Sequence, residues 1–118
     1  MAQPVFIYGT LKRGFNLAWA MDGQRFLGEA TTAPHYRMYN CGQYPGLVDC
    51  TDGIAIHGEL WEVNDYGLVL LDEVEAVETG LFERRAIALD SPSEYPQTDA
   101  YFYCQSVDDL GDAGNLWN

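Results

Sequence analysis

Short apolar runs, each closed by a glycine, a proline or a polar turn, set the pattern of this chain. The first run is Val5-Phe6-Ile7-Tyr8, whose β-branched and aromatic residues are typical of a buried strand. Gly9 ends the run, and a polar turn follows that closes at Gly14. Further strands are predicted over residues 25–32, around Tyr36 and Met38, and over residues 47–48, 54–63, 82–90 and 100–104.

Two stretches have helical character instead. Leu68 to Val77 repeats its apolar residues with helical spacing, and Asn64 is a suitable N-cap before it. A shorter helix is predicted over residues 17–21, capped by Asn16.

Many short strands and one longer helix predict the fold class. We expect a small single α+β domain over residues 1–118, with a curved, barrel-like mixed β-sheet and one main α-helix. The tail over residues 105–118 is acidic and is predicted to be weakly structured, although Leu116 and Trp117 are suited to docking on the body.

One acidic residue of the main helix lies on its apolar side. With Leu68 at zero on a helical wheel, Leu71 lies near 300° and Glu75 lies near 340°, between the two leucines. A carboxylate held among apolar groups has a raised pKa, which suits a general acid or base. The alternative is that Glu75 lies at the edge of the apolar arc and pairs with Arg84 or Arg85.

The turn after the first strand is a second candidate feature. A strand that ends at a glycine, here Gly9, often presents a row of backbone N–H groups, which bind carboxylates, phosphates or a developing oxyanion. The alternative is an ordinary chain reversal after the strand.

Composition narrows the class of protein. The 118 residues include 18 acidic and 6 basic side chains, and the formal net charge is -12. This charge disfavours nucleic acid and anionic membranes as partners. Cys41, Cys50 and Cys104 lack metal-ligand spacing and indicate reduced thiols, with a single bridge left open. The N-terminus does not resemble a signal peptide and no apolar run reaches membrane-spanning length, so a soluble cytoplasmic protein is expected.

Several motifs, in a consistent order, resemble one family. Tyr8-Gly9-Thr10-Leu11 resembles the Tyr-Gly-Ser/Thr-Leu signature of the γ-glutamylcyclotransferase-like proteins, which include γ-glutamylamine cyclotransferases and avirulence-induced-gene-like proteins. Five later segments are similar to family motifs, and the resemblance covers residues 5 to 104: Tyr44-Pro45-Gly46, Gly58 to Trp61, Leu71 to Glu75, Leu81 to Arg84, and Ala100 to Tyr103. Two positions depart from the family pattern, with Ala76 where Gly is usual and Phe82 where Tyr is usual.

The resemblance implies a fold and an activity. It implies a γ-glutamylcyclotransferase-like domain that acts on a small γ-glutamyl compound, closing 5-oxoproline and releasing an amine, with no metal or organic cofactor. The leaving amine stays open between an amino acid, a peptide, a lysine side chain and an aminoglycoside.

The resemblance also implies roles for named residues. Glu75 is the implied catalytic acid/base, and Gly9, Thr10 and Leu11 are the implied backbone donors to substrate. Tyr8 and Tyr103 are the implied walls of the pocket.

Three alternatives stand beside this interpretation. One is a small-metabolite binding or regulatory module on the same fold, without turnover. Another is acyl transfer with Thr10 as nucleophile, although the two isolated histidines offer it no dependable base. The third is an acidic interaction protein without a pocket, which predicts that Glu75 is fully exposed to solvent.

Overall fold

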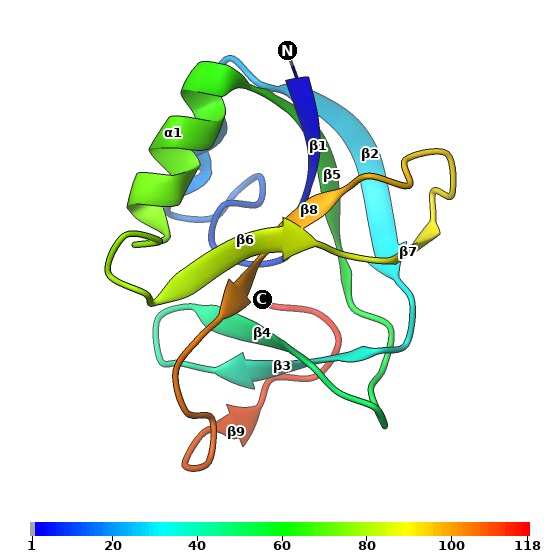
Figure 1. Ribbon diagram of the computed structural model, residues 1–118, viewed down its shortest axis with the longest axis vertical. Helices are drawn as coiled ribbons and strands as arrows, with labels where there is room; N and C mark the ends of the chain where they lie inside the picture. Colours follow the sequence, from blue (N-terminus) through cyan, green and yellow to red (C-terminus); the bar gives the residue numbers. More distant parts are fainter. Residues whose placement is uncertain (1) are drawn as a thin grey trace.

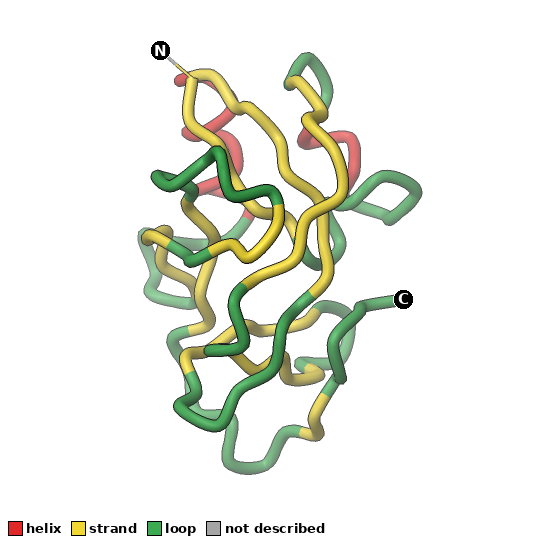
Figure 2. The backbone as a smooth tube through the Cα atoms, turned by 90° about the vertical axis from the view of Figure 1, so that its right-hand side faces the viewer, coloured by secondary structure: helices red, strands yellow, loops and turns green. Residues whose placement is uncertain are grey.

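Two β-sheets and one α-helix make up the fold (Figure 1), seen in a computed structural model that describes residues 2–118. The larger sheet has six strands, in the order β6 (Phe82–Ala86), β8 (Asp99–Tyr103), β1 (Ala2–Ile7), β5 (His57–Asn64), β2 (Arg25–Thr32) and β7 (Leu89–Ser91). The smaller sheet has the order β4 (Pro45–Asp49), β3 (Tyr36–Asn40) and β9 (Gly111–Asp112). It lies below the larger sheet in the views of Figures 1 and 2.

The larger sheet curls because its two edge strands are adjacent in the sequence. Residues 82–90 were predicted to form one strand, but they form β6 at one edge and β7 at the other. Only residues 87–88 join them, and two extended residues span about 7 Å. The Ile87 N–H donates to the carbonyl of Thr98, and the Ala88 carbonyl accepts from the N–H of Ala33, each at 2.9 Å. The expected barrel-like α+β fold is therefore confirmed as a curled half-barrel, with mixed strand directions.

Strand β1 lies at the centre of the curled sheet. It runs antiparallel to β5 from Ala2 opposite Asn64 to Ile7 opposite Glu59, and it is parallel to β8 on its other side. A Cβ atom on Gly58 of β5 would collide with the Ile7 carbonyl oxygen. Glycine inside this strand therefore permits the close backbone approach of β5 to β1.

Alternating side chains of the central strands fill two apolar clusters, one on each face of the sheet. Phe6 belongs to the cluster that contains Leu60 and Phe102, whereas Val5 and Ile7 belong to the cluster beneath the helix. The period of two along β1 places consecutive residues on opposite faces, so this strand is buried on both sides.

Helix α1 (Asp65–Val74) begins where the sequence predicts its cap. The Asn64 side chain accepts a hydrogen bond of 2.8 Å from the Gly67 N–H, and Leu71 is fully buried under the helix. The helix packs on β5 and on the 3-10 helix η1 (Ala18–Met21). The short helix was predicted correctly in place, but Leu17 precedes it and no side chain caps it, so Asn16 is not its cap.

The main helix ends three residues earlier than predicted, at Val74. Ala76 has φ +52°, the left-handed conformation that stops a helix. The N–H groups of Ala76 and Val77 donate to the carbonyls of Glu73 and Asp72, at 3.0 Å each. This is a Schellman motif, and it leaves Glu75 as the capping residue at the helix end.

The C-terminal tail is more ordered than the sequence predicts. It contributes β9, and the Asn115 carbonyl accepts a 2.8 Å hydrogen bond from the His57 N–H. Trp117 packs against the core, as expected, and its carbonyl accepts a 2.7 Å hydrogen bond from Lys12 Nζ. Leu116 is 44% exposed. Within residues 2–118, no helix has the length and apolar character needed to traverse a bilayer.

Candidate active site

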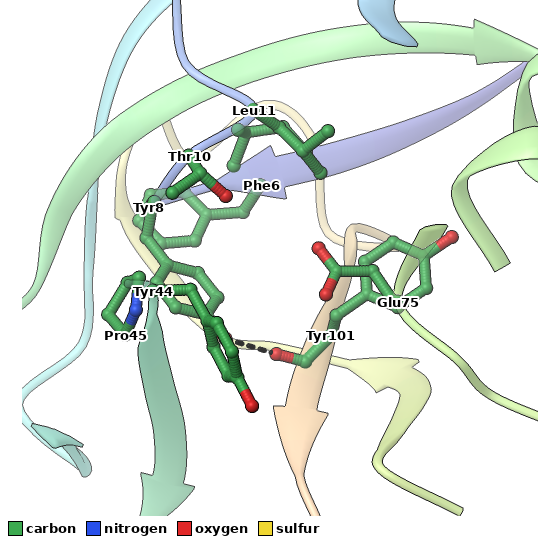
Figure 3. A pocket seen from close by; sticks show the side chains of 10 residues that line it. Phe6, Tyr8, Thr10, Leu11, Tyr44, Pro45, Glu75 and Tyr101 are labelled. Carbon is green, nitrogen blue, oxygen red and sulfur yellow. Dashed lines mark hydrogen bonds between the residues drawn. The ribbon is translucent and has the colours of Figure 1, made fainter. Parts of the chain in front are cut away.

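A cleft opens where β1 ends. Its walls are residues 6–11 of the first strand and turn, Tyr44 just before β4, Pro45 at the start of β4, Tyr101 of β8, and Glu75 after the helix. Figure 3 shows the Glu75 carboxylate and the Thr10 hydroxyl directed toward the same space. The fold thus brings the first turn and the end of α1 to one cavity, as the sequence-based hypothesis required.

Glu75 is a half-buried carboxyl in this cleft. Burial raises the pKa of the Glu75 carboxyl from 4.5 to about 7. Within residues 2–118, no ion pair or hydrogen bond to its carboxylate is present. An unpaired carboxyl with this pKa exchanges protons readily near neutral pH.

The alternative partners of Glu75 are occupied elsewhere. Arg84 pairs with Asp72 and Asp99, both at 3.1 Å. Arg85 Nη2 pairs with Asp49 Oδ2 at 2.6 Å, and Arg85 Nε lies 3.8 Å from Glu83 Oε2. The edge-of-helix alternative is therefore wrong, and so is the alternative in which Glu75 is fully exposed.

The turn after β1 presents free backbone donors. The carbonyls of Gly9 and Thr10 accept hydrogen bonds from the N–H groups of Lys12 and Leu17, at 3.0 Å each. The N–H groups of Gly9, Thr10 and Leu11 have no hydrogen-bond acceptor within the part of the chain that the structure describes. Three consecutive donors at the wall of a cleft form a binding site for an anion or an oxyanion.

Gly9 is required for the shape of this wall. A Cβ atom at position 9 would lie 2.7 Å from Cγ of Pro45 and 2.8 Å from its Cδ. The first turn and the small sheet therefore meet at a contact that only a glycine allows.

A buried carboxylate behind the turn holds it in place, and sequence reasoning missed this role. Glu59 of β5 is 6% exposed and accepts from the Arg13 backbone N–H at 3.2 Å and from Arg13 Nε at 3.1 Å. It also accepts from Trp61 Nε1 at 3.1 Å. An acidic residue inside the otherwise apolar Gly58–Trp61 run was the available signal.

The ring of Tyr8 forms a wall of the cleft, while its hydroxyl makes hydrogen bonds to the backbone of other strands. The hydroxyl donates to the Tyr101 carbonyl at 2.7 Å and accepts from the Leu47 N–H at 3.3 Å. Burial, and next the nearby Glu75 charge, raises the pKa of Tyr8 well above its usual value. Tyr8 therefore shapes the cavity as a neutral phenol.

Tyr101, rather than Tyr103, is the tyrosine of β8 that lines the cleft. Its hydroxyl donates to Asp72 Oδ1 at 2.6 Å, which fixes the ring beside the end of the helix. Tyr103 shares the same face of the strand but packs its ring 5.4 Å from that of Phe82. Alternation along β8 cannot choose between residues 101 and 103, because both point the same way and only the pairing register separates them.

Phe82, one of the two departures from the family pattern, lies behind the cleft. It is 3% exposed, and its ring is 5.9 Å from that of Tyr44, which does line the cleft. A tyrosine hydroxyl at position 82 would therefore lie in the aromatic packing around Tyr44. Tyr44 and Pro45 are further cleft residues to which the sequence analysis assigned no site role.

Within residues 2–118, no three His, Cys, Asp or Glu side chains are grouped to hold a metal ion.

Sequence comparisons find relatives along most of the chain. A family model described as "Gamma-glutamyl cyclotransferase, AIG2-like" matches residues 5–118. A Vibrio cholerae protein, named provisionally as a gamma-glutamylcyclotransferase, is 35% identical over 92 residues, which are 78% of this chain and 76% of that protein. The gamma-glutamylaminecyclotransferase of Bos taurus is 37% identical over 81 residues, which are 62% of this chain and 48% of that protein.

Solved structures share the fold. The crystal structure of an AIG2-like protein from Mus musculus superposes with a TM-score of 0.81 at 25% identity, covering 94% of this chain and 85% of that one. The solution structure of the protein ytfP from Escherichia coli superposes with a TM-score of 0.71 at 30% identity, covering 98% of this chain and 95% of that one. Since the family model spans nearly the whole chain and the same curled fold recurs in these structures, this protein belongs to the gamma-glutamyl cyclotransferase, AIG2-like family.

Proposed function

We propose that this protein is a γ-glutamyl cyclotransferase whose chemistry is carried by the cleft around Glu75. The substrate is a γ-glutamyl amide, and the products are 5-oxoproline and a free amine. The observation that carries the proposal is an unpaired Glu75 carboxyl with a pKa of about 7, facing a cleft walled by three free backbone N–H groups.

The reaction is an intramolecular acyl transfer. The α-nitrogen of the glutamyl group attacks its own γ-carbonyl carbon, the new C–N bond closes a five-membered ring, and the original amide C–N bond breaks. Holding the glutamyl chain curled with nitrogen and carbonyl in contact supplies much of the rate enhancement. A small cleft closed by the rings of Tyr8 and Tyr101 is suited to that task.

Glu75 moves the proton. As a carboxylate it takes a proton from the substrate α-ammonium, which frees the lone pair for attack. As a carboxylic acid it then gives this proton to the departing nitrogen, so that the leaving group is a neutral amine. The second proton lost by the attacking nitrogen passes to water or to the released amine. A group with a pKa of about 7 serves in both directions near neutral pH.

The turn supplies the hydrogen-bond donors that stabilise negative charge during the reaction. The N–H groups of Gly9, Thr10 and Leu11 bind the α-carboxylate of the substrate or the oxyanion of the tetrahedral intermediate. Neutral donors held by the surrounding fold stabilise charge there without a competing cation beside the α-ammonium. Glu59 keeps these donors in position through its two hydrogen bonds to Arg13.

Acyl transfer from Thr10 is less well supported. A threonine nucleophile needs a neighbouring base, and among the described residues that line the cleft there is no histidine or lysine. Glu75 is the acidic side chain of the lining, and the intramolecular amine of the substrate makes a protein nucleophile unnecessary.

The test is a matched pair of variants, Glu75→Gln and Glu73→Gln, assayed for 5-oxoproline release over a panel of γ-glutamyl amides. Glu73 is an exposed acid on the same helix, so its variant controls for the loss of one charge. We expect Glu75→Gln to lower kcat by about 10² to 10⁴ and Glu73→Gln to leave it nearly unchanged. Full activity in Glu75→Gln would show that Glu75 is not the base. Tight binding of a γ-glutamyl amide by the wild type, without product, would identify a binding module.

A further inference from the structure

Three charged side chains meet behind the wall of the cleft. They are Asp72 of α1, Arg84 of β6 and Asp99 of β8. Arg84 Nε donates to Asp72 Oδ1 and Arg84 Nη1 donates to Asp99 Oδ2, at 3.1 Å each. All three side chains are half-buried, and none of them lines the cleft. The proposed reaction gives this cluster no role.

Tyr101 connects the cluster to the cleft. Its hydroxyl donates to Asp72 Oδ1 at 2.6 Å, and its carbonyl accepts from the Tyr8 hydroxyl at 2.7 Å, the dashed line of Figure 3. Burial, and next the hydrogen bond to Asp72, raises the pKa of Tyr101, so its hydroxyl keeps the proton that it donates. Tyr101 is therefore held by α1 at its hydroxyl and by Tyr8 at its backbone. This chain of contacts joins the helix before Glu75 to the strand before the donor turn (residues 9–11).

Asp72 lies close to Glu75 on the same helix end. It precedes Glu75 by three residues, which is about one helical turn. The Glu75 N–H still donates to the Leu71 carbonyl at 2.9 Å, so the backbone is helical up to the acid. The hydrogen bonds of Asp72 to Tyr101 and Arg84 tie this last turn to β8 and β6. The position of Glu75 in the cleft depends on that attachment.

The cluster also sets the charge at this end of the helix. It holds one positive and two negative side chains. The charges of Arg84 and of Glu75 both act on the Tyr101 hydroxyl, which lies between the cluster and the cleft. The other ionisable side chains around Glu75 are tyrosines with raised pKa values on the facing walls and exposed acids of its own segment: Tyr8, Tyr44, Tyr101, Glu73 and Glu78. Asp72 and Asp99 therefore determine how much of the Arg84 charge remains uncompensated there.

We propose that Asp72 and Arg84 are positioning residues for Glu75. Asp72 anchors the Tyr101 ring and the helix end, and its ion pair with Arg84 balances the positive charge beside the acid. This inference rests on the proposed function, in which Glu75 moves the proton. Asp72 and Arg84 do not touch the substrate, and they act through Tyr101 and through their charges.

Two variants that change the charge in opposite directions test the proposal. The pH dependence of kcat/KM for 5-oxoproline release from one γ-glutamyl amide reports the ionisation of Glu75, with a midpoint expected near pH 7 in the wild type. Asp72→Asn removes a negative charge, which favours the Glu75 carboxylate and lowers the midpoint. Arg84→Gln removes a positive charge and raises it. Each shift is expected to be about half a pH unit or more.

Two further variants separate charge from anchoring. Glu73→Gln removes the same charge as Asp72→Asn from an exposed position of the same helix, so its midpoint should stay near that of the wild type. Tyr101→Phe keeps every charge and loses the hydrogen bond to Asp72. It should lower kcat by about fivefold to tenfold through a less fixed Glu75, with little movement of the midpoint. A wild-type kcat in Tyr101→Phe would contradict the anchoring.

Midpoints of Asp72→Asn and Arg84→Gln that match the wild type, or that move in the same direction, would overturn the positioning role and leave the cyclotransferase proposal standing. A purely structural role predicts lost stability without opposite shifts. If Asp72→Asn does not fold, Asp99→Asn supplies the same loss of charge without removing the anchor of Tyr101, and the same downward shift is expected.

Absence of product from the wild type would reject the cyclotransferase proposal without deciding this inference. The midpoint of Glu75 is then measured without substrate, by carbon-13 NMR of the glutamate side chains, with the Glu75 signal assigned from its loss in Glu75→Gln. Opposite shifts in the two charge variants are expected there as well, and an unmoved Glu75 signal in both folded variants would overturn the inference.

Discussion

Glu75 is a carboxyl group whose protonated form is favoured by its surroundings. Helical periodicity located it on the apolar side of the helix, and the structure places it in a cleft without a basic partner. An ion pair with Arg84 would have stabilised the charged form and lowered the pKa, giving a structural residue. Arg84 instead forms ion pairs with Asp72 and Asp99. Glu75 therefore has no cationic partner, and its burial raises its pKa to about 7.

This raised pKa has a measurable cost in stability. Between the unfolded pKa of 4.5 and the folded pKa of about 7, the native state binds more protons at Glu75 than the unfolded state does. Stability therefore falls as pH rises through this window. Glu75→Gln resembles the protonated form, so we expect it to match the wild type near pH 4.5 and to exceed it at pH 8 by on the order of 2 kcal/mol.

Denaturant unfolding of the wild type and the variant from pH 4.5 to pH 8 measures this difference. Glu73→Gln is the matched control, because Glu73 is exposed and a similar pH-dependent gain is not expected there. A stability difference between wild type and Glu75→Gln that is the same at both ends of the pH range would contradict the burial of this carboxyl.

At the scale of the element, the end of α1 decides where Glu75 points. The left-handed conformation of Ala76 closes the Schellman motif and turns the chain away immediately after Glu75. Among the described residues, Ala76 is the one non-glycine residue with a positive φ. The family pattern described above has Gly at this position, and glycine adopts the left-handed conformation without the steric cost of a Cβ atom.

We expect Ala76→Gly to stabilise the protein. Alanine pays a steric cost in the left-handed region that glycine avoids, and the gain is partly offset by the larger conformational entropy of glycine in the unfolded chain. The expected net gain is about 0.5–1 kcal/mol. Chemical denaturation measures it, and kcat should stay near the wild-type value because the backbone conformation is already the one that glycine prefers.

Ala86→Gly provides the comparison for that variant. Ala86 is an exposed residue of β6 without a positive φ, so the same substitution there should destabilise the protein. If both variants lose stability to a similar extent, the conformation assigned to residue 76 is wrong.

At the scale of the whole molecule, closure of the curled sheet and docking of the tail complete the structure. Residues 87–88 join the two edges of the sheet, and the tail then packs against the core on the side of the small sheet. Lys12, one residue after the donor turn, donates to the Trp117 carbonyl. The end of the chain therefore supports the element that forms one wall of the cleft.

Two Trp→Ala variants test the docked tail. Trp117 packs against the core and Trp19 is 54% exposed. Trp117→Ala should lower the free energy of unfolding by about 1–2 kcal/mol. This is less than the cost of truncating a fully buried aromatic residue, because the Trp117 indole is only half-buried. Trp19→Ala should change it by less than about 0.5 kcal/mol. Equal effects of the two variants would mean that the tail is not docked in solution.

Local patterns in the sequence were sufficient for most of the elements and for the central acid. The run of β-branched and aromatic residues predicted the buried first strand, Asn64 predicted the start of the helix, and helical spacing placed Glu75 on its apolar side. These properties depend on residues close together in the chain, so the sequence determines them directly. The resemblance to family motifs added the first turn and the expected chemistry.

Only the tertiary structure decided how these pieces meet. The division of residues 82–90 between two sheet edges, the choice of Tyr101 over Tyr103 at the cleft, and the pairing of Arg84 away from Glu75 all depend on contacts between distant segments. Strand register and charge pairing are set by packing in three dimensions, where several local arrangements are nearly equal in energy until the whole chain has closed. The burial that raises the pKa of Glu75 also depends on these contacts between distant segments.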